Sequence, residues 1–409
     1  MGMNETPSAN RVHIGIFGRR NAGKSSMINA VTGQNLAIVS DIKGTTTDPV
    51  SKAMELLPLG PVVMIDTPGL DDEGELGEKR MAKGFQVLNK TDIAVLVIDG
   101  MAAGSREELE RVEKPLLNRI SGKEIPYVIA VNKSEKLTES RKKEIRDFFG
   151  KEANLLFVSA KTGQNIEKLK ECIARLAPSE DAQKRLVRDL LQNGDIAVLV
   201  VPVDSAAPKG RLILPQQQVI RDCLEAGAIP VVTRETELPA ALKALAKKPK
   251  VVITDSQAFE RVEKDTPEDV YLTSFSILMA RWKGDLMQQA AGAAAIDSLK
   301  DGDTVLISEG CTHHRQCEDI GTVKMPKWLQ SYSGKELEFQ FTSGTEFPED
   351  LSGYALIVHC GGCMLNEREM KYRLQCAKDA GIPMTNYGTA IAKMHGILGR
   401  SMEIFGDVV

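Results

Sequence analysis

A glycine-rich loop between a predicted strand and a predicted helix constrains the fold more than any other feature of this sequence. Residues 12–17 read VHIGIF, and Gly18-x-x-x-x-Gly23-Lys24-Ser25 follows at the start of a helical pattern. In this setting the glycines let backbone N–H groups converge on a phosphate at a helix N-terminus. The lysine then reaches the terminal phosphates and the serine binds magnesium. The motif therefore predicts a nucleotide-binding α/β domain in this part of the chain.

Two further segments predict the rest of a magnesium and γ-phosphate site. Thr46 lies in the segment DIKGTTTD (41–48), where a threonine from a switch loop would complete the magnesium shell. The predicted strand 62–66 ends in Asp66-x-x-Gly69. Its aspartate would hold magnesium through water, and its glycine amide would sense the γ-phosphate. We therefore expect a nucleoside triphosphatase that requires Mg²⁺.

The next two strands end in motifs that predict guanine as the base. After YVIAV comes Asn132-Lys133-x-Glu135, which resembles the guanine-reading NKxD element. Its carboxylate would accept two hydrogen bonds from guanine N1 and N2, which adenine cannot offer. Glu135 is one methylene longer than the usual aspartate, and the sequence does not decide whether this weakens guanine selectivity. The residues expected to contact GTP are Gly18, Asn21, Ala22, Gly23, Lys24, Ser25, Ser26, Asp66, Gly69, Asn132, Lys133, Glu135, Ser159, Ala160 and Lys161.

The loop GRRNAGKS and the segment DIKGTTTD resemble those of the TrmE–Era-like GTPases. The resemblance implies that Asn21 ligates a potassium ion, which stands against the phosphates as an arginine finger would. Leu70 follows the DTPG motif, where Ras-like proteins use a glutamine to orient the attacking water. Because leucine cannot do this, we expect slow hydrolysis that potassium stimulates and sodium stimulates poorly. Lys24, Asn21 and Thr46 are the residues expected to act in hydrolysis.

Strands and helices continue to alternate after this domain. Strands are expected at 195–203, 229–234 and 251–255, and helices at 214–227, 237–249 and 256–264. The alternation predicts a parallel sheet covered by helices. The segment shows no phosphate loop, nucleophile–base pair or metal spacing, so we expect a surface for homodimerisation. The predicted domains are 1–178 for GTP binding, 179–268 for dimerisation and 269–409 for a metal centre.

Cysteine and histidine are concentrated in the last third of the chain. One long helix is expected from Leu278 to Leu299, followed by strands at 303–310, 336–343 and 354–360. The first of these strands ends at Cys311-x-His313, and the last ends at His359-Cys360-x-x-Cys363. Because sites in open parallel sheets form at the carboxyl ends of the strands, we expect the two segments to converge on a metal. The fold class is therefore a P-loop GTPase domain followed by two smaller α/β domains with mainly parallel sheets.

Residue chemistry leaves two kinds of metal centre open. Cys311, His313, Cys360 and Cys363 could form a closed tetrahedral zinc site. Three thiolates with one exchangeable non-cysteine position could instead hold an iron–sulfur cluster. Thiolates suit both metals, and the spacing does not choose between them.

The chain as a whole resembles the HydF family of GTPases, which mature iron-only (FeFe) hydrogenase. The resemblance rests on the C-x-H … H-C-x-x-C pattern, the surrounding CTHHRQCEDIG and the TrmE–Era-like motifs. It implies that Cys311, Cys360 and Cys363 hold a four-iron four-sulfur (4Fe-4S) cluster. It also implies a scaffold that carries the two-iron precursor of the hydrogenase active site. The implied partners are the FeFe-hydrogenase apoprotein and radical-SAM maturation enzymes.

The fourth position of such a cluster has three candidate ligands, His313, His359 and Glu318. A non-thiolate ligand is easily displaced, so it could yield to a bridging group from an incoming complex. Cys317 lies outside the pattern and is expected to be structural.

The alternative function is an RNA-modification or ribosome-assembly GTPase with a structural zinc. Against it stand a formal net charge of −4 and only two tryptophans without aromatic–basic interleaving. We therefore expect no nucleic-acid partner. Apolar runs such as 196–203 fall far short of the roughly 20 residues that span a bilayer, and no signal-peptide pattern is found. We expect a cytoplasmic protein without membrane contact.

Overall fold

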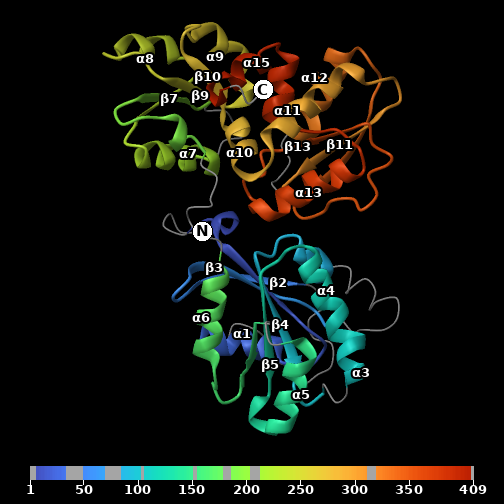
Figure 1. Cartoon of the computed structure of the whole chain (residues 1–409). Coiled ribbons are helices and arrows are strands. Elements are labelled where there is room, and N and C mark those ends of the chain that lie inside the picture. The colour runs from blue at the N-terminus through green and yellow to red at the C-terminus, as the bar shows by residue number, and fades with distance from the viewer. Residues whose placement is uncertain are drawn as a thin grey trace. The chain divides into compact units, whose positions relative to one another are not determined.

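A computed structural model describes most of the chain in two compact units. The described residues are 6–33, 49–69, 84–102, 106–150, 154–177, 186–202, 212–310 and 319–406. The units comprise Met1–Gln183 and Lys184–Val409 (Figure 1).

The first unit contains a six-stranded sheet in the order β2-β3-β1-β4-β5-β6. All neighbouring strands are parallel except β2, which runs antiparallel to β3. The strands are β1 Val12–Phe17, β2 Val50–Leu56, β3 Gly60–Asp66, β4 Ile93–Asp99, β5 Tyr127–Asn132 and β6 Leu155–Phe157. The continuous apolar run of β4 is buried along its whole length, as expected for a strand covered on both faces.

Helices cover both faces of this sheet (Figure 1). Met27 and Leu169, from α1 and α6, pack in one core, whereas Leu116 and Ile145, from α4 and α5, pack in another. The helices are α1 Lys24–Thr32, α3 Arg106–Glu108, α4 Lys114–Gly122, α5 Glu139–Phe149 and α6 Ile166–Leu176, with a π-helical segment at Leu109–Glu113 and 3-10 turns at Ser8–Asn10 and Ser134–Lys136. This layering leaves the carboxyl ends of the strands open for a site.

The second unit contains two four-stranded sheets in the orders β10-β9-β7-β8 and β12-β11-β13-β14. Every neighbouring pair in both sheets is parallel. The strands are β7 Ile196–Val200, β8 Ile229–Thr233, β9 Val251–Thr254, β10 Tyr271–Ser274, β11 Thr304–Glu309, β12 Glu338–Ser343, β13 Leu356–His359 and β14 Met384–Asn386. The fold class predicted from the sequence is therefore confirmed, although β10 and β14 were not among the expected strands.

The expectation of one long helix from Leu278 to Leu299 is wrong. Helix α10 ends at Lys283, and Gly284 leaves the helical conformation with a φ of −130° and a ψ of −146°. The carboxylate of Asp285 then accepts a 2.9 Å hydrogen bond from the Gln288 amide to start α11. Glycine has low helix propensity and aspartate favours an N-cap, so this pair ends one helix and begins the next.

Most helices of the second unit pack around one core that both sheets share, whereas α13 packs in a smaller second cluster. Ile277 and Leu278 of α10 belong to the same cluster of buried side chains as Val198 of one sheet and Val305 of the other. The helices are α7 Leu214–Glu225, α8 Leu238–Ala244, α9 Phe259–Asp265, α10 Phe275–Lys283, α11 Leu286–Ala294, α12 Met325–Ser333, α13 Glu367–Asp379, α14 Tyr387–Met394 and α15 Leu398–Met402, with a π-helical segment at Ile320–Lys324 and short 3-10 turns. Among the described helices, none has the length and apolar character needed to cross a membrane. The division at 268 and 269 stays a prediction.

Candidate functional site

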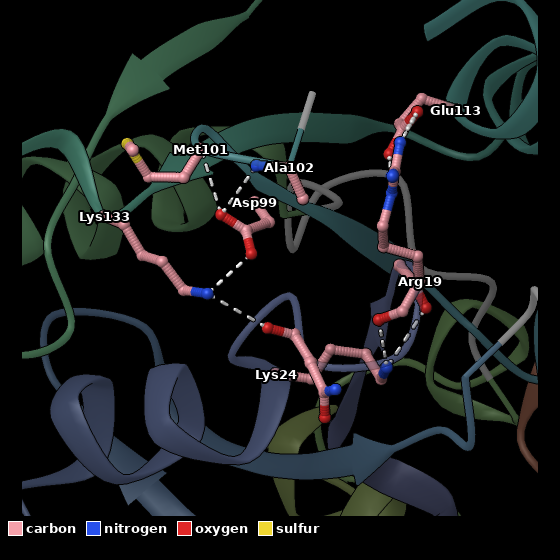
Figure 2. A network of polar contacts seen from close by, with 9 residues as sticks. Arg19, Lys24, Asp99, Met101, Ala102, Glu113 and Lys133 are labelled. Carbon is pink, nitrogen blue, oxygen red and sulfur yellow. Dashed lines mark hydrogen bonds and ion pairs between the residues drawn. The ribbon is translucent and has the colours of Figure 1, made fainter. Parts of the chain in front are cut away.

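The phosphate loop joins β1 to α1 and is fixed by its lysine. The buried ammonium of Lys24 donates hydrogen bonds to the carbonyls of Gly18 at 3.1 Å and Arg19 at 2.8 Å (Figure 2). Gly23 has a φ of +92°, and a Cβ there would lie 2.3 Å from the side-chain nitrogen of Asn132. Only glycine fits both the conformation and the space, so backbone N–H groups can approach a phosphate closely.

Two residues predicted to hold magnesium lie together in the structure. The Ser25 hydroxyl donates a 2.7 Å hydrogen bond to Oδ2 of Asp66, which ends β3. The other oxygen, Oδ1, is buried and has no hydrogen-bond partner among the described residues. Burial raises the pKa of Asp66, opposed by the Ser25 hydrogen bond and the charge of Lys24. A buried carboxylate oxygen without a partner, beside a hydroxyl, fits a hard divalent cation.

Asn132 connects the phosphate loop to the loop after β6. Its side-chain nitrogen donates to the Ala22 carbonyl at 3.0 Å, and its oxygen accepts a 3.0 Å hydrogen bond from the Ala160 amide. The neighbouring Lys133 forms a 2.5 Å ion pair with Asp99 and contacts the Asn21 carbonyl at 3.4 Å (Figure 2). The residues predicted to read guanine thus also fix the phosphate loop.

Glu135 is the residue expected to read the base edge. It is exposed, and a hydrogen bond from the buried Ser159 is the main reason why the pKa of its carboxyl is lowered. The carboxylate is therefore ionised and open to solvent near neutral pH. Lys161, two residues after Ser159, is exposed. Asn21 is also exposed and has a φ of +59°.

A buried ion pair behind the phosphate loop was not expected from the sequence. Arg19 makes two hydrogen bonds to Glu113, of 2.6 and 2.7 Å, and the Glu113 side chain is only 2% exposed (Figure 2). Burial raises the pKa of Glu113, whereas Arg19 opposes this shift. Glu113 ends the π-helical segment before α4, so the pair ties the phosphate loop to that helix.

The thiol-bearing loop of the second unit follows β13. The sulfur of Cys360 accepts hydrogen bonds from the backbone amides of Gly310, at 3.1 Å, and Gly362, at 3.4 Å. Gly310 follows β11, the strand beside β13, so the carboxyl ends of neighbouring parallel strands meet here. Burial raises the pKa of the Cys360 thiol to about 11 and raises that of Cys363. Amide donors aimed at sulfur favour a thiolate ligand and fit a metal–thiolate centre.

Two buried cations beside this loop could not be predicted from the sequence either. Lys283 donates to carbonyls of the loop, and burial lowers its pKa to about 8, opposed by Cys363 and Cys360. Arg373 of α13 is fully buried and forms an ion pair with Glu369. The sequence places Lys283 inside a continuous helical pattern, and no local pattern distinguishes either residue.

His359 has both ring nitrogens engaged, which argues against the expectation that it could be the fourth ligand. Nδ1 lies 2.7 Å from the Cys360 carbonyl, and Nε2 lies 3.0 Å from a guanidinium nitrogen of Arg373. A carbonyl only accepts and a guanidinium only donates, so Nδ1 carries the proton and Nε2 accepts. Burial and Arg373 lower the pKa of His359 to about 3. Neither nitrogen offers a lone pair to a metal in this arrangement.

Several predicted site residues lie outside the described part of the chain. They are Thr46, Leu70, Cys311, His313, Cys317 and Glu318. Within the described ranges, no three His, Cys, Asp or Glu side chains form a group that could hold a metal ion. The convergence of Cys311 with Cys360 and Cys363 therefore stays a prediction.

Three family profiles match consecutive parts of the chain. The hydrogen maturase F dimerization domain matches residues 186–284, and the hydrogen maturase F tetramerization domain matches residues 287–404. The 50S ribosome-binding GTPase profile matches residues 13–133. The matches therefore cover both units.

Curated relatives and solved structures resemble part of the chain. GTPase Der of Caldicellulosiruptor saccharolyticus is 32% identical over 183 residues, or 42% of this chain and 40% of that protein. The tRNA modification GTPase MnmE of Heliobacterium modesticaldum is 33% identical over 168 residues, or 41% of this chain and 34% of that protein. The chain thus spans well under half the length of these relatives. Similar solved structures include a probable GTP-binding protein engB (26% identity, 40% of this chain, 98% of that chain, TM-score 0.32) and Aquifex aeolicus Era bound to GDP.AlF4- (19%, 61%, 97%, 0.37).

Proposed function

Because the chain belongs to the hydrogen maturase F family and carries a G domain, we propose that it is a GTP-hydrolysing scaffold for hydrogenase maturation. In this proposal it binds a 4Fe-4S cluster and assembles or delivers the two-iron precursor of the FeFe-hydrogenase active site. The observation that carries the proposal is the combination in one chain of a complete phosphate loop with a cysteine loop whose Cys360 sulfur accepts backbone amide hydrogen bonds. The alternative, an RNA-directed GTPase with structural zinc, is not favoured, because hydrogen maturase F domains match 186–284 and 287–404.

The G domain would bind GTP with Mg²⁺ on Ser25 and Asp66. Bound magnesium supplies charge stabilisation to the phosphates. Lys24 is held at the loop carbonyls, from which its ammonium can reach the terminal phosphates. The exposed Asn21, in a left-handed conformation, is the residue proposed to ligate potassium. With leucine at position 70, hydrolysis would be slow and potassium-stimulated.

The cluster would be held by the thiolates of Cys311, Cys360 and Cys363. The amide hydrogen bonds to the Cys360 sulfur support this assignment, because such donors stabilise anionic sulfur. A bound cluster would supply an iron position that an incoming two-iron complex can bridge. This two-iron complex is the cargo, which the chain would pass to the hydrogenase apoprotein after receiving it from radical-SAM enzymes.

Self-association would occur through the second unit. The edge strand β8 exposes Ile229 and Val232, at 52% and 47%. An apolar edge strand readily pairs with another chain. This edge supports a homodimer, and the matched dimerization and tetramerization domains agree with oligomers. A cytoplasmic location stays a prediction.

Anaerobic reconstitution with iron and sulfide tests the proposed function. The wild type should take up four irons and four sulfides per chain, as a 4Fe-4S cluster requires, and gain the broad visible absorption of such a cluster. The Cys360→Ser variant should lose this absorption, whereas Cys223→Ser, at a buried helical position, should keep it. Stoichiometric zinc without a visible band would contradict the proposal.

In parallel, GTP hydrolysis should be faster in potassium than in sodium and should be lost in Lys24→Ala; equal rates in both salts would refute the potassium site.

A further inference from the structure

Lys283 is a buried cation with an unusual set of partners. It is the last residue of α10 and is only 2% exposed. Its ammonium donates to three backbone carbonyls, those of Gly362 at 3.2 Å, Cys363 at 3.0 Å and Leu365 at 2.6 Å. An ammonium has three donors, so this short loop uses all of them. The side chain therefore fixes the backbone that carries both described cysteines of the metal site.

Carbonyl oxygens alone do not neutralise a buried charge. Among the described residues, no carboxylate forms an ion pair with the Lys283 ammonium, and the Trp282 ring lies 5.0 Å from it. A buried cation without an anion is costly, so the Lys283 ammonium favours binding of an anionic group at the Cys360–Leu365 loop.

We propose that Lys283 is a positioning residue that holds the Cys360–Leu365 loop and supplies a fixed positive charge to the anionic metal–thiolate centre bound there. The inference rests on the proposed cluster site and adds a group that tunes it. The charge would stabilise the thiolates and the more reduced, more negative state of a cluster. Removing the charge should therefore make the cluster harder to reduce and easier to lose.

Three substitutions separate the charge from the tether. Lys283→Met removes both charge and donors, Lys283→Gln keeps a donor without charge, and Lys283→Arg keeps both. Lys264→Met is the matched control, because Lys264 is an exposed helical lysine paired with Glu260. The readouts are the cluster reduction potential, the rate of iron loss to a chelator, and, in apo-protein, hydrogen exchange of the peptide that contains residues 360–366.

The expected effects of the substitutions follow the charge that each leaves at position 283. Lys283→Met and Lys283→Gln should shift the potential to more negative values and lose iron about 10- to 100-fold faster, as removal of groups that support metal ligands typically does. Lys283→Arg and the control should stay near wild type, and exchange in the loop should rise most in Lys283→Met. A Lys283→Met variant with wild-type potential and iron retention would overturn the proposal. If Lys283→Met does not fold, equal potentials in the Arg and Gln variants would overturn it.

The same experiment separates this inference from the proposed function. A wild-type protein that binds no cluster would refute the proposed function, while loop exchange in the apo-protein still tests whether Lys283 holds the loop. A wild type that binds a cluster through Cys360, together with an unaffected Lys283→Met variant, would refute the inference alone.

Discussion

The buried ion pair of Arg373 and Glu369 leads to a specific prediction about the stability of the second unit. The guanidinium is 0% exposed and lies 3.0 Å from the Glu369 carboxylate, whose side chain is 6% exposed. It also donates to the Ser308 hydroxyl at 3.2 Å and the Gly344 carbonyl at 2.9 Å. Substituting Arg373→Met keeps much of the side-chain volume but leaves a buried carboxylate without its cation. Breaking such a pair from one side costs about 3–5 kcal/mol.

The matching Glu369→Gln substitution should cost less, because Arg373 keeps its neutral partners and glutamine keeps one acceptor. The double variant buries no unpaired carboxylate. It should therefore be more stable than the sum of the single changes predicts, with a coupling of about 1–3 kcal/mol. A loss of about 4 kcal/mol would lower the Tm of a unit of this size by roughly 10 °C.

Intrinsic fluorescence makes the measurement specific to this unit. The two tryptophans of the chain, Trp282 and Trp328, lie in α10 and α12. Urea unfolding of apo-protein followed by tryptophan emission should show a lower midpoint for Arg373→Met with an unchanged slope. A loss below about 1 kcal/mol, or fully additive single changes, would show that the pair is not the buried network described here.

Three other predictions concern the G domain and the edge strand. Asn132→Ala removes hydrogen bonds to two loops and should weaken GDP binding about tenfold or more, as measured by titration with a fluorescent analogue; unchanged affinity would contradict this role. Burial raises the pKa of Glu113 above its value in the unfolded chain, so ionising this carboxyl costs stability. The first unit should therefore lose stability as the pH rises from about 4.5 through that raised pKa. The Glu113→Gln variant should lack this loss, as measured by hydrogen exchange of α4. Ile229→Lys combined with Val232→Lys should shift the sedimentation of the protein toward monomer, and an unchanged oligomer would exclude β8 as the interface.

The G-domain site could be predicted from the sequence because each of its motifs is local. The glycines and lysine of the phosphate loop are adjacent in the chain, and a strand places them at a helix start. Ser25 and Asp66 were assigned to one cation from separate motifs, and the structure brings them within 2.7 Å. Likewise, Cys360 follows a parallel strand as expected.

The supporting residues could not be predicted, because their partners are distant in sequence. Lys283 contacts carbonyls about 80 positions away, and Arg19 pairs with Glu113, 94 positions away. A lysine or arginine in a helical pattern ordinarily predicts a solvated face. The helix break after Lys283 could not be predicted for a related reason. Gly284 and Asp285 weaken a helix, but tertiary packing decides whether the helix ends there. Because α10 ends there, the Lys283 ammonium reaches the Cys360–Leu365 loop.

The contacts of His359 narrow the choice of fourth cluster ligand. Rotating the ring toward a metal would take its Nδ1 proton from the Cys360 carbonyl and its Nε2 from buried Arg373. Each buried polar group left unpaired costs about 1–3 kcal/mol. In the proposed cluster, the fourth position would therefore fall to His313, Glu318 or a group that the protein does not supply. His359→Gln should lower stability yet keep the visible absorption and paramagnetic resonance of the reduced cluster, whereas a changed spectrum would restore His359 as a ligand.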